Sequence, residues 1–471
     1  MRIGRLLALF IGLPFLGACV VGPDYKAPDM DAPAEFVSQE LLKSLNEGKT
    51  DADFSAQWWM GFTDPILDQL VTAGLDNNFQ LVAARARVKE ASARLALAGA
   101  GDELQTEAGL DQGLEAERNL NDADTTKTAS VSGGLSVALP LDVFGRTARE
   151  VEAALAGLQA AKAELRGRVL GISSEITREY LRLRGSQRQL VLLVESVHLQ
   201  EKTLSIVKSR YEAGLSPELD MRRAETSVEN LRAGIPPLKE ALTNARNRLA
   251  SLTGQYPGVY ETLLHEHQEI PVYKGKFPEL VPLAVLTQRP DIRQTEEELK
   301  RAVARIGLAE AEYYPTFRLI GAINIGATGV TGAPALNVLT ASLGALIDQV
   351  VTDGGARKAN VEIAQSQAEE ALALYRDTLL SASEEVEISL AAIKSSLDRQ
   401  SSLQKAVKSS EISFYQAETL YQQGLISFLD VVDAQRVLAN GEQQLASERT
   451  NYATEIATLF RVLGTEIKAG T

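Results

Sequence analysis

The chain has 471 residues, of which 45% are hydrophobic and only 6% aromatic, and its formal net charge is −14. No basic cluster with interleaved aromatic residues occurs, so the sequence gives no support for nucleic-acid binding. A single cysteine, Cys19, excludes an internal disulfide framework and a cysteine-rich metal site. The dominance of Ala, Leu, Glu, Gln, Arg and Ser is typical of long helices.

The first residues predict a secretory signal peptide over 1–18. Basic residues precede an apolar run over 6–15, and Leu16-Gly17-Ala18-Cys19 has the small residues that precede a lipidated cysteine. We expect Cys19 to carry a covalent lipid and expect no other cofactor; an ordinary signal peptide with a leftover thiol is the alternative. Val20 after the cysteine suggests sorting to an outer membrane. No apolar run of about 20 residues follows, so any membrane crossing would have to use strands.

The sequence contains an internal duplication. Segment 211–225 (YEAGLSPELDMRRAE) is written again as 421–435 (YQQGLISFLDVVDAQ), with Tyr, Gly-Leu, Leu-Asp and Ala at matching positions. The same offset, from 211 to 421, aligns further pairs without a gap: Gly145 with Gly355, Arg166 with Arg376, Glu175 with Glu385, Asn230 with Asn440 and Gly254 with Gly464. An ungapped match over this span predicts two structural repeats.

Pro- and Asp-rich residues after the cysteine predict an extended arm over 19–57. A helix then begins with Asp64 as its N-cap and Pro65 at its first position. Segments of alternating polarity follow at about 104–116 and 129–141, and again at about 316–326 and 337–350. Rows of about 10 residues suit strands that cross a membrane obliquely. The pattern leaves a soluble hairpin with one buried face as an alternative.

After each pair of strands, a glycine-containing turn leads into a very long helix. In the first half, the apolar residues step by three, four or seven positions, as in a coiled coil: Leu155, Leu158, Leu165, Val169, Ile172, Ile176, Leu183, Leu190, Val194, Val197, Leu204, Val207 and Tyr211. No proline interrupts residues 141–216, and about 68 helical residues at 1.5 Å each would extend about 100 Å.

Each long helix should end at a C-cap glycine, Gly214 or Gly424, from which a second helix returns. The segment Ile235-Pro236-Pro237 is expected to kink the first return helix, and the second has no such interruption. Four glycines inside the first long helix are interpreted as points where a neighbouring helix approaches closely: Gly157, Gly167, Gly171 and Gly185.

These patterns divide the chain into two repeats, 58–254 and 279–464, joined by a connector at 255–278 and followed by a short tail at 465–471. The fold class is mostly α with a small β part. Four strands cannot close a barrel, which needs about eight. In lipid, an open sheet edge would leave backbone groups unpaired at several kcal/mol each. A chain of this kind must therefore oligomerise if it spans a bilayer, giving a strand total that is a multiple of four.

Three motifs carry a resemblance to a known family: the run from Cys19 through Gly22-Pro23-Asp24-Tyr25, the pair Trp58-Trp59 followed by Phe62-Thr63-Asp64-Pro65, and Arg289-Pro290-Asp291-Ile292-Arg293. Together they resemble the lipoprotein branch, often labelled NodT-type, of the TolC- and OprM-like outer membrane efflux proteins. The resemblance covers nearly the whole chain.

This resemblance implies a homotrimer with a twelve-stranded barrel in the outer membrane of a Gram-negative bacterium and an α-helical barrel projecting through the periplasm. An equatorial belt would come from the termini and the connector. Family members are passive exit ducts of tripartite pumps that meet a periplasmic adaptor and serve an inner-membrane transporter of the RND type. The cargo stays open, whether drug, metal or solvent.

The resemblance also assigns roles to residues at the far end of the long helices. The tip residues expected to meet the adaptor are Tyr211, Gly214, Leu215, Asp220, Gly424 and Leu425. Asp430 and Asp433 match carboxylate rings that narrow the entrance, and three copies would place six like charges around one axis. Simple helix capping by Asp430, or equally by Asp220, is the alternative.

Tyr421 is expected to latch this gate by hydrogen bonding. Ile426 stands where a basic residue of the family can form a locking salt bridge. An ionic lock is therefore in doubt, and a hydrophobic constriction would replace it.

No pattern in the chain predicts catalysis. His265 and His267 in the connector are too few to indicate a metal site, and no nucleophile spacing, phosphate-binding glycine loop or HExxH motif occurs. The sequence thus favours a small-molecule efflux duct over an enzyme. Two alternatives stay open: a duct for type I protein secretion, and a periplasmic coiled-coil scaffold or adhesin without a pore.

Overall fold

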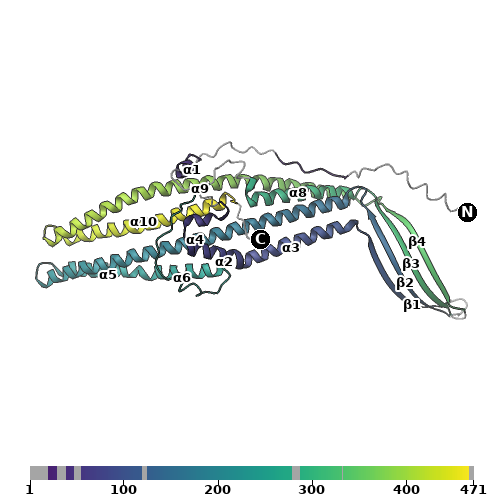
Figure 1. Ribbon diagram of the computed structural model, residues 1–471, viewed down its shortest axis with the longest axis horizontal. Coiled ribbons are helices and arrows are strands. Elements are labelled where there is room, and N and C mark those ends of the chain that lie inside the picture. Colours follow the sequence, from purple (N-terminus) through teal and green to yellow (C-terminus); the bar gives the residue numbers. More distant parts are fainter. Residues whose placement is uncertain are drawn as a thin grey trace. The chain divides into compact units, whose positions relative to one another are not determined.

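The computed structural model describes residues 20–28, 39–46, 55–118, 125–277, 287–330 and 333–465. The predicted signal peptide, Cys19, much of the arm and the tail beyond residue 465 lie outside this part. The described chain is mostly helical with one small sheet (Figure 1), which confirms the predicted fold class at this level.

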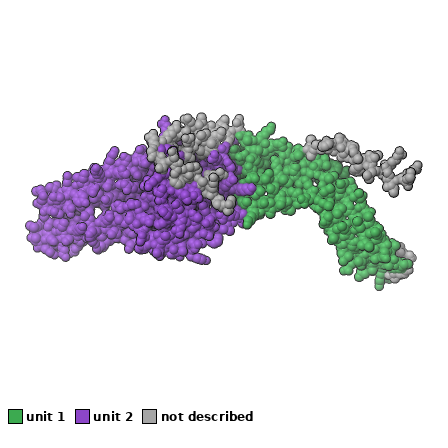
Figure 2. Space-filling model, in the orientation of Figure 1, with its two compact units in different colours: residues 1–29, 87–161, 294–375 green, residues 30–86, 162–293, 376–471 purple. Residues whose placement is uncertain are grey.

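In chain order the elements are α1 (Gln39–Asn46), η1 (Ser55–Phe62), α2 (Pro65–Asn77), α3 (Phe79–Gly99), η2 (Ala100–Asp102), β1 (Gln105–Arg118), β2 (Thr125–Leu141), α4 (Arg146–Glu212), α5 (Glu218–Ala233), α6 (Ile235–Leu252), α8 (Pro290–Ala311), β3 (Thr316–Val330), β4 (Leu336–Asp348), α9 (Ala356–Gln422) and α10 (Phe428–Val462). Figure 2 colours two compact units, and both long helices contribute residues to each. The strands belong to the first unit, and the helical tips and the connector to the second.

The four strands form one antiparallel sheet in the order β1-β2-β3-β4. β1 and β3 extend beyond their predicted ends, to Arg118 and Val330, and β2 begins before its predicted start, at Thr125. β4 ends at Asp348, just before its predicted end. Residues 117–128, which separate the first two predicted strands, still pair at their ends, as Glu117 does with Thr126. Ladder hydrogen bonds use backbone groups, so pairing continues after the apolar alternation has stopped.

The register places the predicted apolar rows on one face of the sheet. Residues directly opposite on paired strands share a face, and one such row is Leu110, Gly133, Ile325 and Leu339. The adjacent row of residues lies on the opposite face, and its side chains are polar or absent: Gly109, Gly134, Asn324 and Thr340. Among the residues that the structure describes, nothing covers this apolar face, since Leu110 and Leu339 are 80% and 70% exposed.

The helix boundaries follow their local signals. Asp64 caps α2 by accepting hydrogen bonds from the amides of Ile66 and Leu67, and Pro65 is the first residue of that helix, as predicted. The two prolines after Ile235 divide the first return helix into α5 and α6, because proline cannot donate the backbone bond that continues a helix. The second return helix, α10, is unbroken over 35 residues.

The prediction of close helix approach at interior glycines holds at one position and is wrong at another. A Cβ added to Gly185 would lie 2.2 Å from Oγ1 of Thr450 on α10, so only glycine fits there. Nothing lies within 4 Å of such an atom at Gly171. Gly157 and Gly167 show ordinary contact distances. Residue spacing along one helix does not reveal which neighbour faces it.

Most of the apolar seam of α4 is buried, although Leu155, Val194 and Tyr211 are exposed. The main core of the second unit combines this seam with the motif Trp58-Trp59. The indole of Trp58 stacks on Phe460 of α10, with ring centroids 5.2 Å apart and planes 9° from parallel. Tyr273 of the connector packs against the same phenylalanine at 5.3 Å. The connector thus covers one face of α4 and α10.

Candidate functional site: the helical tips and the N-terminal strap

The turns that join α4 to α5 and α9 to α10 have the same geometry. Gly214 and Gly424 adopt positive φ angles of 72° and 76°, which glycine reaches without strain. In each turn, the glycine amide bonds the carbonyl of the preceding tyrosine, Tyr211 or Tyr421, at 2.9 Å. The amide of the following leucine donates to the carbonyl of Arg210 at 2.8 Å in the first turn and to the carbonyl of Leu420 at 2.9 Å in the second. The glycines therefore terminate both long helices, as predicted.

The leucines of both turns lie on the surface. Leu215 is 69% exposed and Leu425 is 67% exposed, and Leu219 and Leu429 nearby are exposed to 56% and 55%. Tyr211 is exposed to 38%. Each tip therefore presents an apolar surface to solvent, which is the kind of surface that binds another protein.

Asp430 has a clear structural task. Its Oδ2 accepts a hydrogen bond from the backbone amide of Ser427 at 3.0 Å and another from the Ser427 hydroxyl at 2.9 Å. These bonds complete a capping box at the start of α10. In the first tip, Asp220 accepts a 3.2 Å bond from the hydroxyl of Ser216 instead, without a capping box.

Asp433 lies one turn further along α10 and is more open. Its side chain is 60% exposed, and its Oδ1 accepts a 2.6 Å bond from the guanidinium of Arg436. An exposed pair of this kind adds little stability, at most about 1 kcal/mol. Asp433 therefore contributes little to the local fold and presents its carboxylate, paired with Arg436, at the surface.

Tyr421 is only 5% exposed, and its hydroxyl makes no hydrogen bond to any residue in the described part of the chain. The hydrogen-bonded latch expected for it is not formed within one chain. Its ring instead contacts Phe428, with centroids 5.7 Å apart, and lies under the guanidinium of Arg210 at 5.0 Å. Half-buried Ile426 packs against the same cluster. Arg210 comes from α4, so this contact joins the two hairpins.

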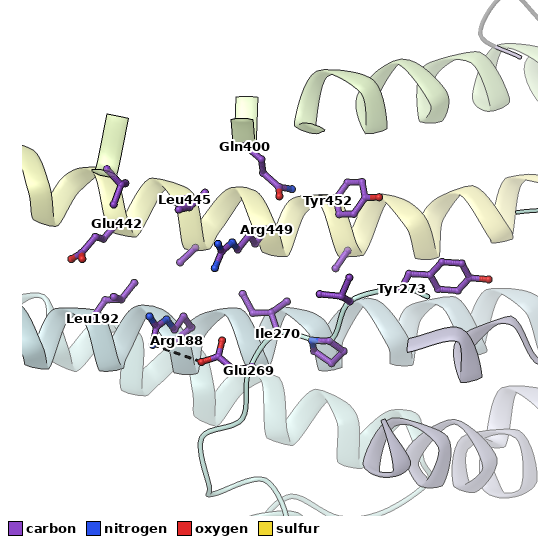
Figure 3. Close-up of a pocket in the computed structure, with 15 residues that line it drawn as sticks. Arg188, Leu192, Glu269, Ile270, Tyr273, Gln400, Glu442, Leu445, Arg449 and Tyr452 are labelled. Atoms are coloured by element: carbon purple, nitrogen blue, oxygen red, sulfur yellow. Dashed lines mark ion pairs between the residues drawn. The ribbon is translucent and has the colours of Figure 1, made fainter. Parts of the chain in front are cut away.

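A cavity of about 460 Å³ lies between α4, α10 and connector residues 269–273 (Figure 3). Four charged side chains line it: Arg188, Glu269, Glu442 and Arg449, of which the first two are 3.9 Å apart. Burial, followed by repulsion from Glu195 and Glu411, raises the pKa of Glu442. Because the lining charges balance, the cavity favours neither sign of ligand. No sequence pattern signals this cavity.

The connector carries two histidines, His265 and His267. Among the described residues no group of three or more His, Cys, Asp or Glu side chains could hold a metal ion. His267 faces Glu269 at 3.9 Å. The connector is held instead by Arg184, which is fully buried and donates to the carbonyl of Glu266 at 2.9 Å and to Gln268 at 2.9 Å.

The residues that follow Cys19 form a strap, residues 20–25, in the first unit. Arg149 of α4 is 3% exposed and donates to the carbonyls of Val21 and Gly22 at 3.0 and 2.9 Å and to Asp24 at 2.9 Å. A Cβ on Gly22 would lie 2.3 Å from the Cα of Gly307, so that position requires glycine. The sequence motif therefore reflects a packed contact. In the sequence, nothing distinguishes Arg149 from other arginines on helix faces, so its contact with the strap could not be predicted.

No helix in the described residues is both long and apolar enough to cross a membrane. Comparison with known proteins decides what the chain is. A model of the outer membrane efflux proteins matches residues 70–255 and again residues 281–465. The chain belongs to this family.

Members with similar sequences span nearly the whole chain. Nodulation protein T of Rhizobium leguminosarum bv. viciae is 31% identical over 446 residues, covering 94% of this chain and 89% of that protein. The cation efflux system protein CusC of Escherichia coli K12 is 27% identical over 468 residues, covering 98% and 99%. The solved outer-membrane channel OprN is 28% identical with a TM-score of 0.87, covering 95% and 99%.

Membership confirms the resemblance noted in the sequence, including its NodT-type branch. It assigns the chain to the outer membrane and to efflux, in a family of channels and not of enzymes. The tip residues, the strap and the sheet are thus parts of an outer membrane efflux protein.

Proposed function

We propose that the chain is one protomer of a homotrimeric exit duct of a tripartite efflux pump. In this duct, small molecules expelled by an inner-membrane transporter of the RND type pass a periplasmic adaptor and leave through the outer membrane. The duct is passive and needs no cofactor beyond the lipid on Cys19.

The observation that carries the proposal is the open sheet. β1 and β4 are its outer strands, and within the described residues neither pairs along its second edge. One face is apolar and exposed. In lipid, unpaired edges would cost several kcal/mol for each backbone group. Three copies joined edge to edge give a closed barrel of twelve strands, with the apolar face towards lipid and the polar face inside.

An internal duplication accounts for the helical part. α4 and α9 each have 67 residues, and their first residues, Arg146 and Ala356, lie at the same offset as the repeated sequence segments. Positive φ angles recur at the same offset, at Gly145 and Gly355 and at Gly254 and Gly464. Two matched hairpins per chain would give six in a trimer, enough for a helical barrel with quasi-sixfold symmetry.

The tips are the end that meets the adaptor. Their leucines are exposed, whereas most other large apolar side chains of α4 near the core are buried. In the trimer, Asp430 and Asp433 would form the carboxylate rings of the gate. The cluster of Tyr421, Phe428 and Ile426 would form the hydrophobic constriction next to them.

The strap supports the lipid anchor. Val20 packs against Gly145, which lies between the end of β2 and the start of α4. A lipid on Cys19 is one peptide bond away from this junction between sheet and helices. Such a position suits insertion into the inner leaflet next to the barrel, with the barrel itself as the main membrane anchor.

The test is to purify the chain in detergent, determine its mass by light scattering, and record currents in planar bilayers. A trimer with discrete conductance steps supports the duct. A monomer, or an oligomer without conductance, overturns it and favours the pore-less scaffold. Type I protein secretion is distinguished by whether deletion of the gene impairs export of a protein or of small molecules.

A further inference from the structure

A group of arginines lies where α4 and α10 pack against each other. The helices are antiparallel neighbours, since the hydroxyl of Ser174 donates to the carbonyl of Ala457 at 3.0 Å and Gln443 donates to the carbonyl of Gln189 at 2.9 Å. Half-buried Arg178 of α4 lies in this seam. Burial, followed by repulsion from Arg182 and Arg461, lowers the pKa of Arg178.

The charges around Arg178 do not cancel. In the part of the chain that the structure describes, Arg178 and Arg461 form no ion pair at salt-bridge distance, whereas Arg182 pairs with Glu179 at 3.5 Å. Glu175 pairs with Arg248. Glu455 is the remaining acid beside Arg178, and it is half-buried. Four arginines face three glutamates, an excess of one positive charge in a chain whose net charge is −14.

This group lies on the face of the helices that is turned away from the connector. The connector side of α4 is marked by Tyr180, whose hydroxyl accepts a 3.0 Å bond from Arg184, the residue that donates to the connector carbonyl of Glu266. An α-helix turns about 100° per residue, so Arg178 and Arg182, each two residues from Tyr180, point about 160° away from it. On α10, Phe460 packs against Tyr273 of the connector, and Glu455 and Arg461 point about 140° and about 100° away from Phe460.

We propose that Arg178 and Arg461, supported by Arg182, form an anion-binding girdle that lines the duct and favours anionic cargo such as carboxylates and phosphates. The inference rests on the proposed trimer, in which the connector belt lies outside the helical barrel and the opposite face lies inside. Three copies then repeat the excess positive charge around one axis. Rings of arginine select anions in other pores because a confined, partly desolvated guanidinium attracts them strongly.

The test is the reversal potential of the reconstituted channel across a KCl gradient. The double variant Arg178→Gln/Arg461→Gln should lower the anion-to-cation permeability ratio by at least about twofold relative to the native channel. The matched control is Arg449→Gln, which removes the same charge from the cavity-lining side of α10 and should leave the ratio unchanged. Arg178→Lys/Arg461→Lys retains the charges and should keep a ratio close to native.

Block by inorganic pyrophosphate gives a second readout. The concentration that halves the current should rise at least about threefold in the Gln double variant and stay near native in the Arg449→Gln channel. If the double variant conducts but neither its permeability ratio nor its pyrophosphate block differs from the control, the girdle is overturned while the duct stands. If the native protein forms no channel, the proposed function itself fails.

Discussion

Arg289 offers a sharp test of how the second unit is held together. Its side chain is 6% exposed, and Arg289 is the first residue of the motif Arg289-Pro290-Asp291-Ile292-Arg293, directly before α8. It donates to the carbonyl of Val462 at the end of α10 at 2.8 Å and to that of Ala382 on α9 at 3.3 Å. It also pairs with Asp291 at 2.6 Å and Glu385 at 2.9 Å. One side chain thus connects three helices.

Replacement by alanine removes the donor to the Val462 carbonyl at the end of α10, and also a longer bond to the Ala382 carbonyl, which is inside α9. A hydrogen bond from a charged group to a buried partner contributes about 1.5–3 kcal/mol. The two carboxylates are 47% and 42% exposed, so water replaces much of what they lose and each adds at most about 1 kcal/mol. Since the Ala382 contact is long, we expect Arg289→Ala to lower the free energy of unfolding by about 3 kcal/mol.

Thermal unfolding in detergent, followed by circular dichroism at equal protein concentration, measures this effect. Arg293→Ala is the matched control, because Arg293 is exposed and, among the residues that the structure describes, donates to the carbonyl of Thr287 at 3.0 Å. That control should change stability by no more than about 0.5 kcal/mol. Arg289→Lys should fall between the two, because an ammonium cannot span all of these acceptors. Equal melting of the alanine variants would refute the reasoning.

The same contacts give a pH dependence. Burial alone would raise the pKa of Asp291, but the hydrogen bonds and charge of Arg289 outweigh burial and hold it below its usual value. The ionised Asp291 carboxylate therefore stabilises the folded state at pH values above its unfolded pKa of about 3.9. This stabilisation is lost as the pH falls through the lower pKa of the folded state and the carboxylate is protonated. The difference in melting temperature between native protein and Arg289→Ala should therefore narrow below about pH 4.

Three further predictions concern the tips and the anchor. Asp430→Asn and Asp433→Asn should each raise single-channel conductance and weaken block by divalent cations, and unchanged values would remove the gate assignment. Asp430→Ala should in addition lower the melting temperature, because loss of the capping box costs about 1 kcal/mol. Leu215→Asp/Leu425→Asp should abolish co-purification of the adaptor without changing conductance; retained binding would place the docking surface elsewhere. Cys19→Ser should abolish metabolic lipid labelling, whereas trimers should still form, and a label that persists would disprove lipidation there.

The roles of the tip aspartates illustrate what spacing can predict and what it cannot. The repeated segment places Asp220 and Asp430 at equivalent positions, which left capping by either one open. Only Asp430 completes a capping box, since its carboxylate meets both the amide and the hydroxyl of Ser427. The first tip has Pro217 at the corresponding position, and proline has no amide hydrogen to donate.

Buried arginines mark the limit of sequence reasoning most clearly. Arg149 holds the strap, Arg184 the connector and Arg289 the end of α10, and the distant partners of these three arginines lie between 82 and 173 residues away. In the sequence, each is one of many arginines on amphipathic helices. Burial and the convergence of distant carbonyls distinguish them, and neither property is local.

The sequence by itself determined the elements of this protein, because helix caps, prolines, glycine turns and the period of the apolar residues act over a few residues. It also determined the family through three short motifs. Only the tertiary structure decided which glycine admits a neighbouring helix, which aspartate caps, and where the arginines of α4 and α10 point. These outcomes depend on contacts between segments far apart in the chain, whose relative placement no local pattern contains.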